Sequence, residues 1–403
     1  MGNRHCGAEA AAARSIVDVC GVLGEPAILE GAGAVRLLGW QFPFVLIPKH
    51  RLEMDLMPVP IRTRNRRMYL PALAMLLALV AGLPSHRAAP AAAAAAAAAH
   101  TYRNPVFAQD FPDPMVLRVG ADYYAYGTTT GWEPSGHLFP ILHSRDLVHW
   151  RYVADAMGTS PMWGNNDWWA PSVIARDGIY YMYFVGVGLK AGGHCLGVAT
   201  ATTPTGPFKD RGIVACADAK GDGYIDPAPF IDAGGKAYLY FSVDNPYHNI
   251  SVLPLSADLL RATGPRAELF TLSQAWEHGT QFSTVEGPFV VKHGALYWLF
   301  YSGNDWQHDY AVGVATARSP LGPFTKYPDN PILHNVRGVT GPGGGSLFQD
   351  ARGSWWLAYH AWTGGPGYDA GGVRNLRIDP LRWRGDTASV RGPTTDTEPA
   401  PAS

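Results

Sequence analysis

Charge and cysteine are both scarce in this sequence. Charged residues make up 16% of the 403 residues, and the formal net charge at pH 7 is −1. This balance predicts neither a nucleic-acid partner nor an acidic tail. The one apolar run near the N-terminus, which ends at Leu83, is shorter than the roughly 20 residues of a membrane-spanning helix. No cysteine directly follows this run, which argues against a lipid-anchored form.

Glycine, proline and aromatic residues are abundant instead. The chain has 46 Gly and 33 Pro, and its aromatic content of 12% includes 13 Trp and 19 Tyr. This composition is typical of many short strands joined by turns rather than of long helices.

The first hundred residues differ in kind from the rest. The stretch "IRTRNRRMYLPALAMLLALVAGL" joins a basic segment to an apolar run, and the alanine run Ala91–Ala99 follows. This is the layout of a secretory signal, so we predict a signal peptide with an alanine-rich linker over residues 57–99 and a secreted protein, extracellular or periplasmic. An uncleaved membrane anchor is the alternative.

A signal should begin a protein, yet a long segment precedes Met57. We expect the true start at Met54, Met57 or Met68, with residues 1–56 a non-native extension from a start codon placed too early. Residues 100–392 are predicted to form one domain, and residues 393–403, which include "TTDTEPAPAS", a disordered tail.

Two of the four cysteines, Cys6 and Cys20, fall in the extension. Cys195 and Cys216 both lie in the predicted domain. Export to an oxidising compartment predicts a disulfide between them. Two buried free thiols are the alternative.

An internal repeat organises the domain. Five aromatic runs, "YYAYG", "YYMYF", "YLYFS", "YWLFY" and "WWLAY", begin at Tyr123, Tyr180, Tyr238, Tyr297 and Trp355, and their spacing is nearly constant. In addition, "GVATATTPTGPF" from Gly197 returns as "GVATARSPLGPF" from Gly313. A period of about 58 residues accommodates four short strands with their loops. Five such units predict an all-β, five-bladed β-propeller; a β-sandwich with chance spacing is the alternative.

A second strand signal precedes each aromatic run. The segments are "FPDPMVL", "WWAPSVI", "YIDPAPF", "TVEGPFVV" and "GPGGGSLF". Proline is tolerated at the start of a strand, so we align these segments as the first strands, which line the channel of a propeller. The aligned position holds Asp113, Ala170, Asp226, Glu286 and a glycine near Gly344. Three carboxylates from three blades are therefore expected to converge at one end of the axis.

Like charges brought together are costly and usually mark a functional site. Three carboxyl groups suit glycoside hydrolysis, which needs one carboxylic acid and one carboxylate across a sugar bond. The third can keep the acid protonated by like-charge repulsion. Asp113 alone would otherwise be interpreted as a turn residue before Pro114, and Asp110 keeps that interpretation.

Aromatic residues near the aligned strands are candidate sugar contacts. Trp168 and Trp169 can stack on a sugar face or pack between blades. His360, in "AYHAW", either reaches the site or is a buried structural histidine.

The segments "NPVFAQDFPDPMVL", "YIDPAPF", "VEGPFVV", "SPLGPF" and "WWLAYHAW" resemble glycoside hydrolase family 43, from about Asn104 to Trp383. The resemblance implies a propeller enzyme that cleaves arabinose- or xylose-containing polysaccharides with inversion. It implies Asp113 as general base, Glu286 as general acid, and Asp226 as the residue that orients Glu286 and raises its pKa. It also implies that Arg374, in "GGVRNLRIDPLRW", faces the substrate.

One segment departs from the family. Many members carry His or another polar residue in the "GPG" segment, where His in some helps to hold a metal ion. Here Gly344 and Gly345 stand in it, so we predict no metal site and no required cofactor, and a structural calcium is disfavoured.

The sequence thus predicts a secreted, monomeric arabinofuranosidase or arabinanase acting on arabinan or arabinoxylan. A β-xylosidase of the same fold is one alternative, and a non-catalytic sugar-binding propeller is another. The expected partner is a polysaccharide or oligosaccharide, with no nucleic acid and no membrane after signal cleavage.

Overall fold

The computed structural model of the protein describes residues 101–131, 136–217, 223–244 and 248–403. Over these ranges the helical structure consists of two short 3-10 turns, η1 (Ala275–Glu277) and η2 (Tyr368–Ala370). None of the described helices has the length and apolar character to cross a membrane. The predicted extension and signal segment lie outside the described residues and stay predictions.

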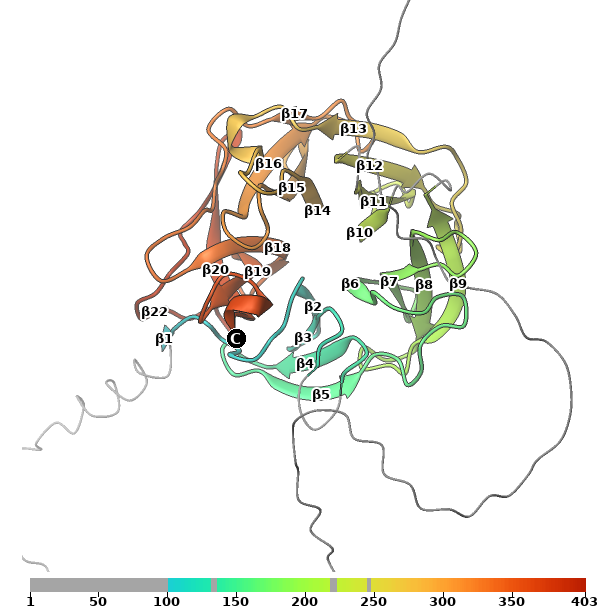
Figure 1. The fold of residues 1–403 in the computed structure, drawn as a ribbon, viewed down its shortest axis with the longest axis horizontal. Helices are drawn as coiled ribbons and strands as arrows, with labels where there is room; N and C mark the ends of the chain where they lie inside the picture. The colour runs from blue at the N-terminus through green and yellow to red at the C-terminus, as the bar shows by residue number, and fades with distance from the viewer. Residues whose placement is uncertain (1–100, 132–135, 218–222, 245–247) are drawn as a thin grey trace, which may run out of the picture. The chain divides into compact units, whose positions relative to one another are not determined.

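Five four-stranded antiparallel sheets surround a central axis in chain order (Figure 1). Each sheet is built from four consecutive strands. Blade one contains β2 (Met115–Val119), β3 (Asp122–Tyr126), β4 (Pro140–Ser144) and β5 (Arg151–Asp155). Blade two contains β6 (Trp169–Arg176), β7 (Ile179–Val187), β8 (His194–Ala201) and β9 (Lys209–Cys216). Blade three contains β10 (Tyr224–Ile231), β11 (Ala237–Val243), β12 (Asn249–Pro254) and β13 (Ala267–Thr271). Blade four contains β14 (Val285–His293), β15 (Leu296–Gly303), β16 (Ala311–Ala317) and β17 (Thr325–Lys326). Blade five contains β18 (Thr340–Gln349), β19 (Trp355–Thr363), β20 (Val373–Arg384) and β21 (Thr387–Val390). The predicted five-bladed β-propeller is confirmed.

The five aromatic runs form the second strands of the blades, β3, β7, β11, β15 and β19. These strands are covered on both faces by neighbouring blades, and every residue of β11 is buried. The hydrophobic core accordingly divides into five clusters, one between each pair of adjacent blades. The aromatic and β-branched repeat therefore follows from packing between blades, which is where most of the apolar surface is removed from water.

A small two-stranded sheet joins the two ends of the described domain. β1 (Thr101–Tyr102) pairs antiparallel with β22 (Glu398–Pro399). The prediction of a disordered tail over residues 393–403 is therefore wrong, and the domain extends beyond residue 392. Polar groups of this tail have partners: the backbone amide of Ala402, for example, donates to the Asp350 carboxylate at 3.1 Å.

Asp379, on β20, fastens both ends to blade five. It is fully buried. Its carboxylate accepts hydrogen bonds from Tyr102 (3.1 Å), from the Thr394 hydroxyl (2.6 Å) and from Tyr359 (2.6 Å). Asp379 thus connects the first and last described segments through one buried acceptor group.

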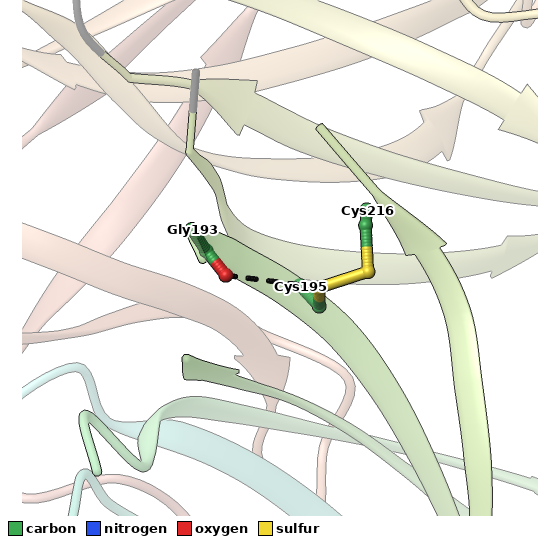
Figure 2. Close-up of a disulfide and its surroundings, with 3 residues drawn as sticks. All are labelled: Gly193, Cys195 and Cys216. Atoms are coloured by element: carbon green, nitrogen blue, oxygen red, sulfur yellow. Dashed lines mark hydrogen bonds between the residues drawn. A yellow bond between two sulfur atoms is a disulfide. The ribbon is translucent and has the colours of Figure 1, made fainter. Parts of the chain in front are cut away.

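The predicted disulfide is present in the structure. Cys195 and Cys216 face each other on the paired strands β8 and β9, with a Cα–Cα separation of 4.2 Å (Figure 2). The bond therefore lies within blade two and fixes its outermost strand to the strand beside it.

We expect Asp379→Ala to lower the free energy of unfolding by about 3 kcal/mol or more, because it leaves several buried donors without an acceptor. Asp386→Ala is the matched control, since Asp386 is exposed at the β20–β21 turn. Urea unfolding followed by tryptophan fluorescence measures both. Equal midpoints for the two variants would contradict the role of Asp379 in closure.

Candidate active site

A cavity of about 290 Å³ opens where the first strands of the five blades begin. Its wall includes the three predicted carboxylates, Asp113, Asp226 and Glu286. The expectation that they converge at one end of the axis is met. A fourth carboxylate, Asp244, also lines the cavity and was missed from the sequence. It directly follows β11, at the same end of the blade.

A left-handed residue marks the start of every first strand. The five residues are Asp113 (φ 53°), Ala170 (φ 46°), Asp226 (φ 54°), Gly287 (φ 61°) and Gly344 (φ 56°). In blades two to five each lies in a bulge, where the pairing with the second strand skips two residues. Left-handed backbone costs an ordinary L-residue roughly 1–2 kcal/mol, and Asp tolerates it better than most. The bulges turn the strand starts toward the axis.

The alignment of Glu286 with Asp113 and Asp226 was therefore wrong by one residue. Gly287 occupies the left-handed position of blade four, and Glu286 precedes it, paired with Ser302. The counterpart of Glu286 in blade two is Trp169, which pairs with Val185 just before the bulge. Both side chains reach the cavity from this preceding position.

The bulges also bind neighbouring blades together. In four of the five junctions the amide of the left-handed residue donates to a side chain on the preceding blade. The four bonds are Ala170 N to Thr128 Oγ1 (2.8 Å), Gly287 N to Ser242 Oγ (3.0 Å), Gly344 N to Ser302 Oγ (2.9 Å) and Asp113 N to His360 Nδ1 (3.0 Å). Between blades two and three the equivalent side chain is Val185, which has no acceptor.

Asp113 is held from several directions. Thr128 Oγ1 donates to Asp113 Oδ2 at 2.5 Å. The Arg374 Nη1 atom lies 3.9 Å from Asp113 Oδ1. Asp113 is thus arranged as an acceptor of protons.

Glu286 is in the opposite electrostatic situation. Removal from water raises its pKa to about 8, and the negative charge of Asp226 adds to this effect. Tyr310 donates to Glu286 Oε1 at 2.7 Å, which moderates the shift. Glu286 therefore keeps its proton at neutral pH and can donate it.

Asp226 lies between Asp113 and Glu286 in the sequence, and its carboxyl group, like that of Glu286, has a raised pKa. Burial raises its pKa to about 7, and the charge of Asp113 acts in the same direction. Gly287 N and Ser242 Oγ donate to Asp226 Oδ2 at 2.9 and 3.2 Å. Asp226 is thereby fixed against the bulge that follows Glu286.

The two adjacent tryptophans, Trp168 and Trp169, lie in different surroundings. Trp168 is buried and packs edge-on against Trp163 at 5.5 Å, so its assignment as a sugar contact is wrong and the packing alternative holds. Consecutive residues point to opposite sides of an extended backbone, so Trp169 lies in the cavity wall instead. Trp169 is 36% exposed, and its ring centre lies 4.8 Å from that of His194.

His360 lines the cavity but is almost wholly buried, at 1% exposure. Its Nδ1 accepts from the Asp113 amide, and burial lowers its pKa well below the usual value, so the ring is neutral with its proton on Nε2. The described contacts therefore make it a structural support for Asp113, as in the alternative interpretation.

Among the described residues, those around His360 form no protein ligand set for a metal ion, and the absence of a cofactor stays a prediction. Within the described ranges no three His, Cys, Asp or Glu side chains converge as a ligand set. A side chain at position 344 would meet His360 Cε1 at 2.5 Å and Asp113 Oδ1 at 2.9 Å. The glycine therefore leaves space for His360 and Asp113.

A carboxyl group that keeps its proton, in one cavity with a second carboxyl group that accepts from Thr128 and faces Arg374, is the arrangement that glycoside hydrolysis requires. The family comparison agrees. The model of glycosyl hydrolases family 43 matches residues 102–388, and the chain belongs to this family. The resemblance inferred from the sequence motifs is confirmed.

Several characterised relatives are similar to the chain. A non-reducing-end α-L-arabinofuranosidase of Bacteroides ovatus is 31% identical over 269 residues, which are 64% of this chain and 47% of that protein. A xylan 1,3-β-xylosidase of a Vibrio species is 27% identical, over 64% of this chain and 49% of that protein. The chain spans about half the length of these curated relatives. The crystal structure of a thermostable family-43 glycoside hydrolase superposes with a TM-score of 0.68 at 34% identity, covering 75% of this chain and 99% of that one.

We expect Asp226→Asn to lower the pKa of Glu286, because it removes the negative charge that acts most strongly on Glu286 while burial remains. The pKa should fall from about 8 yet stay above the ordinary 4.5. Carbon-13 NMR titration of labelled glutamate carboxyls measures the shift directly. Asp244→Asn is the control and should produce a smaller decrease, since the charge of Asp244 has a weaker effect on Glu286. An unchanged titration in Asp226→Asn would exclude the coupling.

Proposed function

We propose that this protein is an inverting glycoside hydrolase with Glu286 as general acid, Asp113 as general base and Asp226 as the modulator of Glu286. The proposal rests on one observation: the carboxyl groups of Glu286 and Asp113 line the same cavity but have different electrostatic surroundings. Glu286 has its pKa raised to about 8, whereas Asp113 accepts from Thr128 and faces Arg374.

In this mechanism Glu286 gives its proton to the leaving oxygen of the glycosidic bond. Asp113 takes a proton from the water that attacks the sugar from the opposite side. Tyr310 donates to Glu286 Oε1 at 2.7 Å, whereas the contact of Oε2 with Thr284 Oγ1 is longer, at 3.4 Å, so we place the proton to be donated on Oε2. Burial and the charge of Asp226 together keep Glu286 protonated, and Asp226 also holds the strand start beside it. No protein–sugar bond forms.

We propose L-arabinofuranose, released from arabinan or arabinoxylan, as the sugar bound next to Glu286. The arabinofuranosidase of Bacteroides ovatus supports this choice, and so does an extracellular exo-α-(1→5)-L-arabinofuranosidase of Cellvibrio japonicus, 26% identical over 69% of this chain and 85% of that protein. A β-xylosidase activity is the second candidate, supported by the Vibrio relative. Hydrolysis of aryl arabinofuranoside, aryl xyloside and debranched arabinan distinguishes them.

A non-catalytic sugar-binding protein is the competing class. A lectin has no use for an acid kept protonated beside a second carboxylate, which supports the enzyme instead. Sugar binding without turnover of any of the three substrates would favour the lectin.

We also propose that the protein is exported and monomeric. The Cys195–Cys216 disulfide supports an oxidising compartment. N-terminal sequencing of protein from culture medium tests both export and the start of the mature chain, and light scattering tests the oligomeric state.

Glu286→Gln should lower kcat by roughly 10²–10⁴-fold on natural oligosaccharides, because these have poor leaving groups that need the proton. Aryl glycosides with acidic phenols should lose much less. The ratio of the two losses, measured on one preparation with an unchanged thermal midpoint, is the test. Activity within threefold of the wild type on an oligosaccharide would remove Glu286 from this role.

The first product should have the inverted anomeric configuration. Asp113 and Glu286 come from the non-adjacent blades one and four, which favours the separation of roughly 6.5–9.5 Å that leaves room for a water. Proton NMR in the first minutes, before mutarotation, identifies the anomer. Asp113→Asn should abolish turnover. If azide restored its activity and gave a glycosyl azide of retained configuration, Asp113 would be a nucleophile rather than a base.

A further inference from the structure

Arg374, at the start of β20, is a largely buried cation inside an aromatic enclosure. Its guanidinium carbon lies 5.5 Å from the ring centres of Trp306 and Trp362 and 5.3 Å from that of Tyr368. The side chain is 14% exposed. Cation–π contacts offset the loss of water around the charge. The enclosure restricts where the guanidinium can lie, but ring faces alone do not fix its rotation.

Tyr368, in η2, fixes that rotation. Its hydroxyl oxygen accepts from Arg374 Nε at 3.1 Å and from Nη2 at 2.9 Å. The same hydroxyl donates its proton to Asp110, with distances of 3.0 Å to Oδ2 and 3.3 Å to Oδ1. One phenol thus uses both its acceptor and its donor capacity in a single chain of hydrogen bonds.

Asp110 completes the arrangement from the segment that leads into blade one. Besides the phenol, its Oδ1 accepts from the backbone amide of Arg374 at 2.9 Å. Asp110 therefore holds the backbone of Arg374 directly and the guanidinium through Tyr368. Its interpretation as a turn residue alone was incomplete, because the sequence does not reveal a contact with the last blade of the chain.

The guanidinium nitrogen that Tyr368 does not bind, Nη1, is directed to the cavity. Nε and Nη2 are engaged by Tyr368, whereas Nη1 lies 3.9 Å from Asp113 Oδ1, too far for a direct hydrogen bond. Arg374 and Asp113 both line the cavity. A hydroxyl group of a bound sugar can accept from Nη1 at this point.

We propose that Tyr368 is a positioning residue that, together with Asp110, rotates Arg374 so that Nη1 meets a hydroxyl group of the sugar beside Asp113. This inference rests on the proposed function and deepens it. The short turn η2 thereby contributes to substrate selection, although Tyr368 acts through Arg374 rather than on the reacting atoms.

The test is Tyr368→Phe, which keeps the ring and removes only the hydroxyl. KM for the aryl glycoside that the wild type hydrolyses should rise about tenfold, the effect of losing a well-oriented hydrogen bond from a charged group, with kcat changed less than about threefold. Tyr152→Phe is the matched control: this tyrosine is 40% exposed, bonds Asp155 on the outer strand of blade one, and should leave KM unchanged. Asp110→Asn should raise KM in the same direction but less.

A double-mutant cycle distinguishes positioning from a general structural role. In an Arg374→Ala background, Tyr368→Phe should add no further increase in KM, because its target is gone. An equal increase in both backgrounds, or an unchanged KM in Tyr368→Phe alone, would overturn the proposal. A wild type inactive on every glycoside would refute the proposed function instead. In that case, calorimetry would measure the binding of L-arabinose and D-xylose in the same double-mutant cycle. A tenfold weaker affinity in Tyr368→Phe would support the positioning role of Tyr368, and an unchanged affinity would overturn it.

Discussion

The hydrogen bonds from the left-handed strand starts to the preceding blades hold the candidate site together. The backbone amide of Asp113 donates to His360 on blade five, and that of Gly287 donates to Ser242 on blade three. Because each bond crosses a blade boundary, the position of one carboxylate depends on the second strand of its neighbour. Asp113, which precedes the first blade, is thus located by a residue of the last.

These bonds matter because the blades are otherwise joined mainly by apolar packing. Each blade consists of four consecutive strands, so among the described residues no strand from one end of the domain completes a blade at the other. Dispersion and hydrophobic contacts between blades are strong but non-directional. Hydrogen bonds are directional, so those at the axis fix the orientation and spacing of neighbouring blades. The buried carboxylate of Asp379 does the same for the two ends of the domain beside the β1–β22 sheet.

Much of the architecture could be predicted from the sequence because packing between blades imposes a period. Aromatic residues must recur on the second strand of every blade, and the segment from Tyr123 to Trp355 shows them at near-constant spacing. The three carboxylates could be found because each lies at a proline-marked strand start. Their roles were implied by the family resemblance, whereas the pKa of Glu286 depends on burial and on Asp226.

What the sequence did not reveal depends on single-residue geometry or on distant contacts. The one-residue offset of Glu286 arises because the glycine, not the acid, takes the left-handed conformation. Trp168 and Trp169 are adjacent and chemically identical, and only the direction of the strand separates them. The C-terminal tail is ordered because it forms hydrogen bonds with residues far away in the sequence, such as Asp350. Asp110 likewise has distant partners, Tyr368 and the backbone of Arg374.

Some of the residues that enclose the cavity and its arginine differ in origin from those that hold the acids. Thr128, Ser242 and Ser302 lie on or directly after the second strands of their blades, while Phe282, Trp306 and Tyr368 come from segments outside the β-strands. Changes in those segments leave the bonds at the axis intact. Over evolutionary time such a propeller can exchange one sugar preference for another while inheriting its catalytic geometry unaltered.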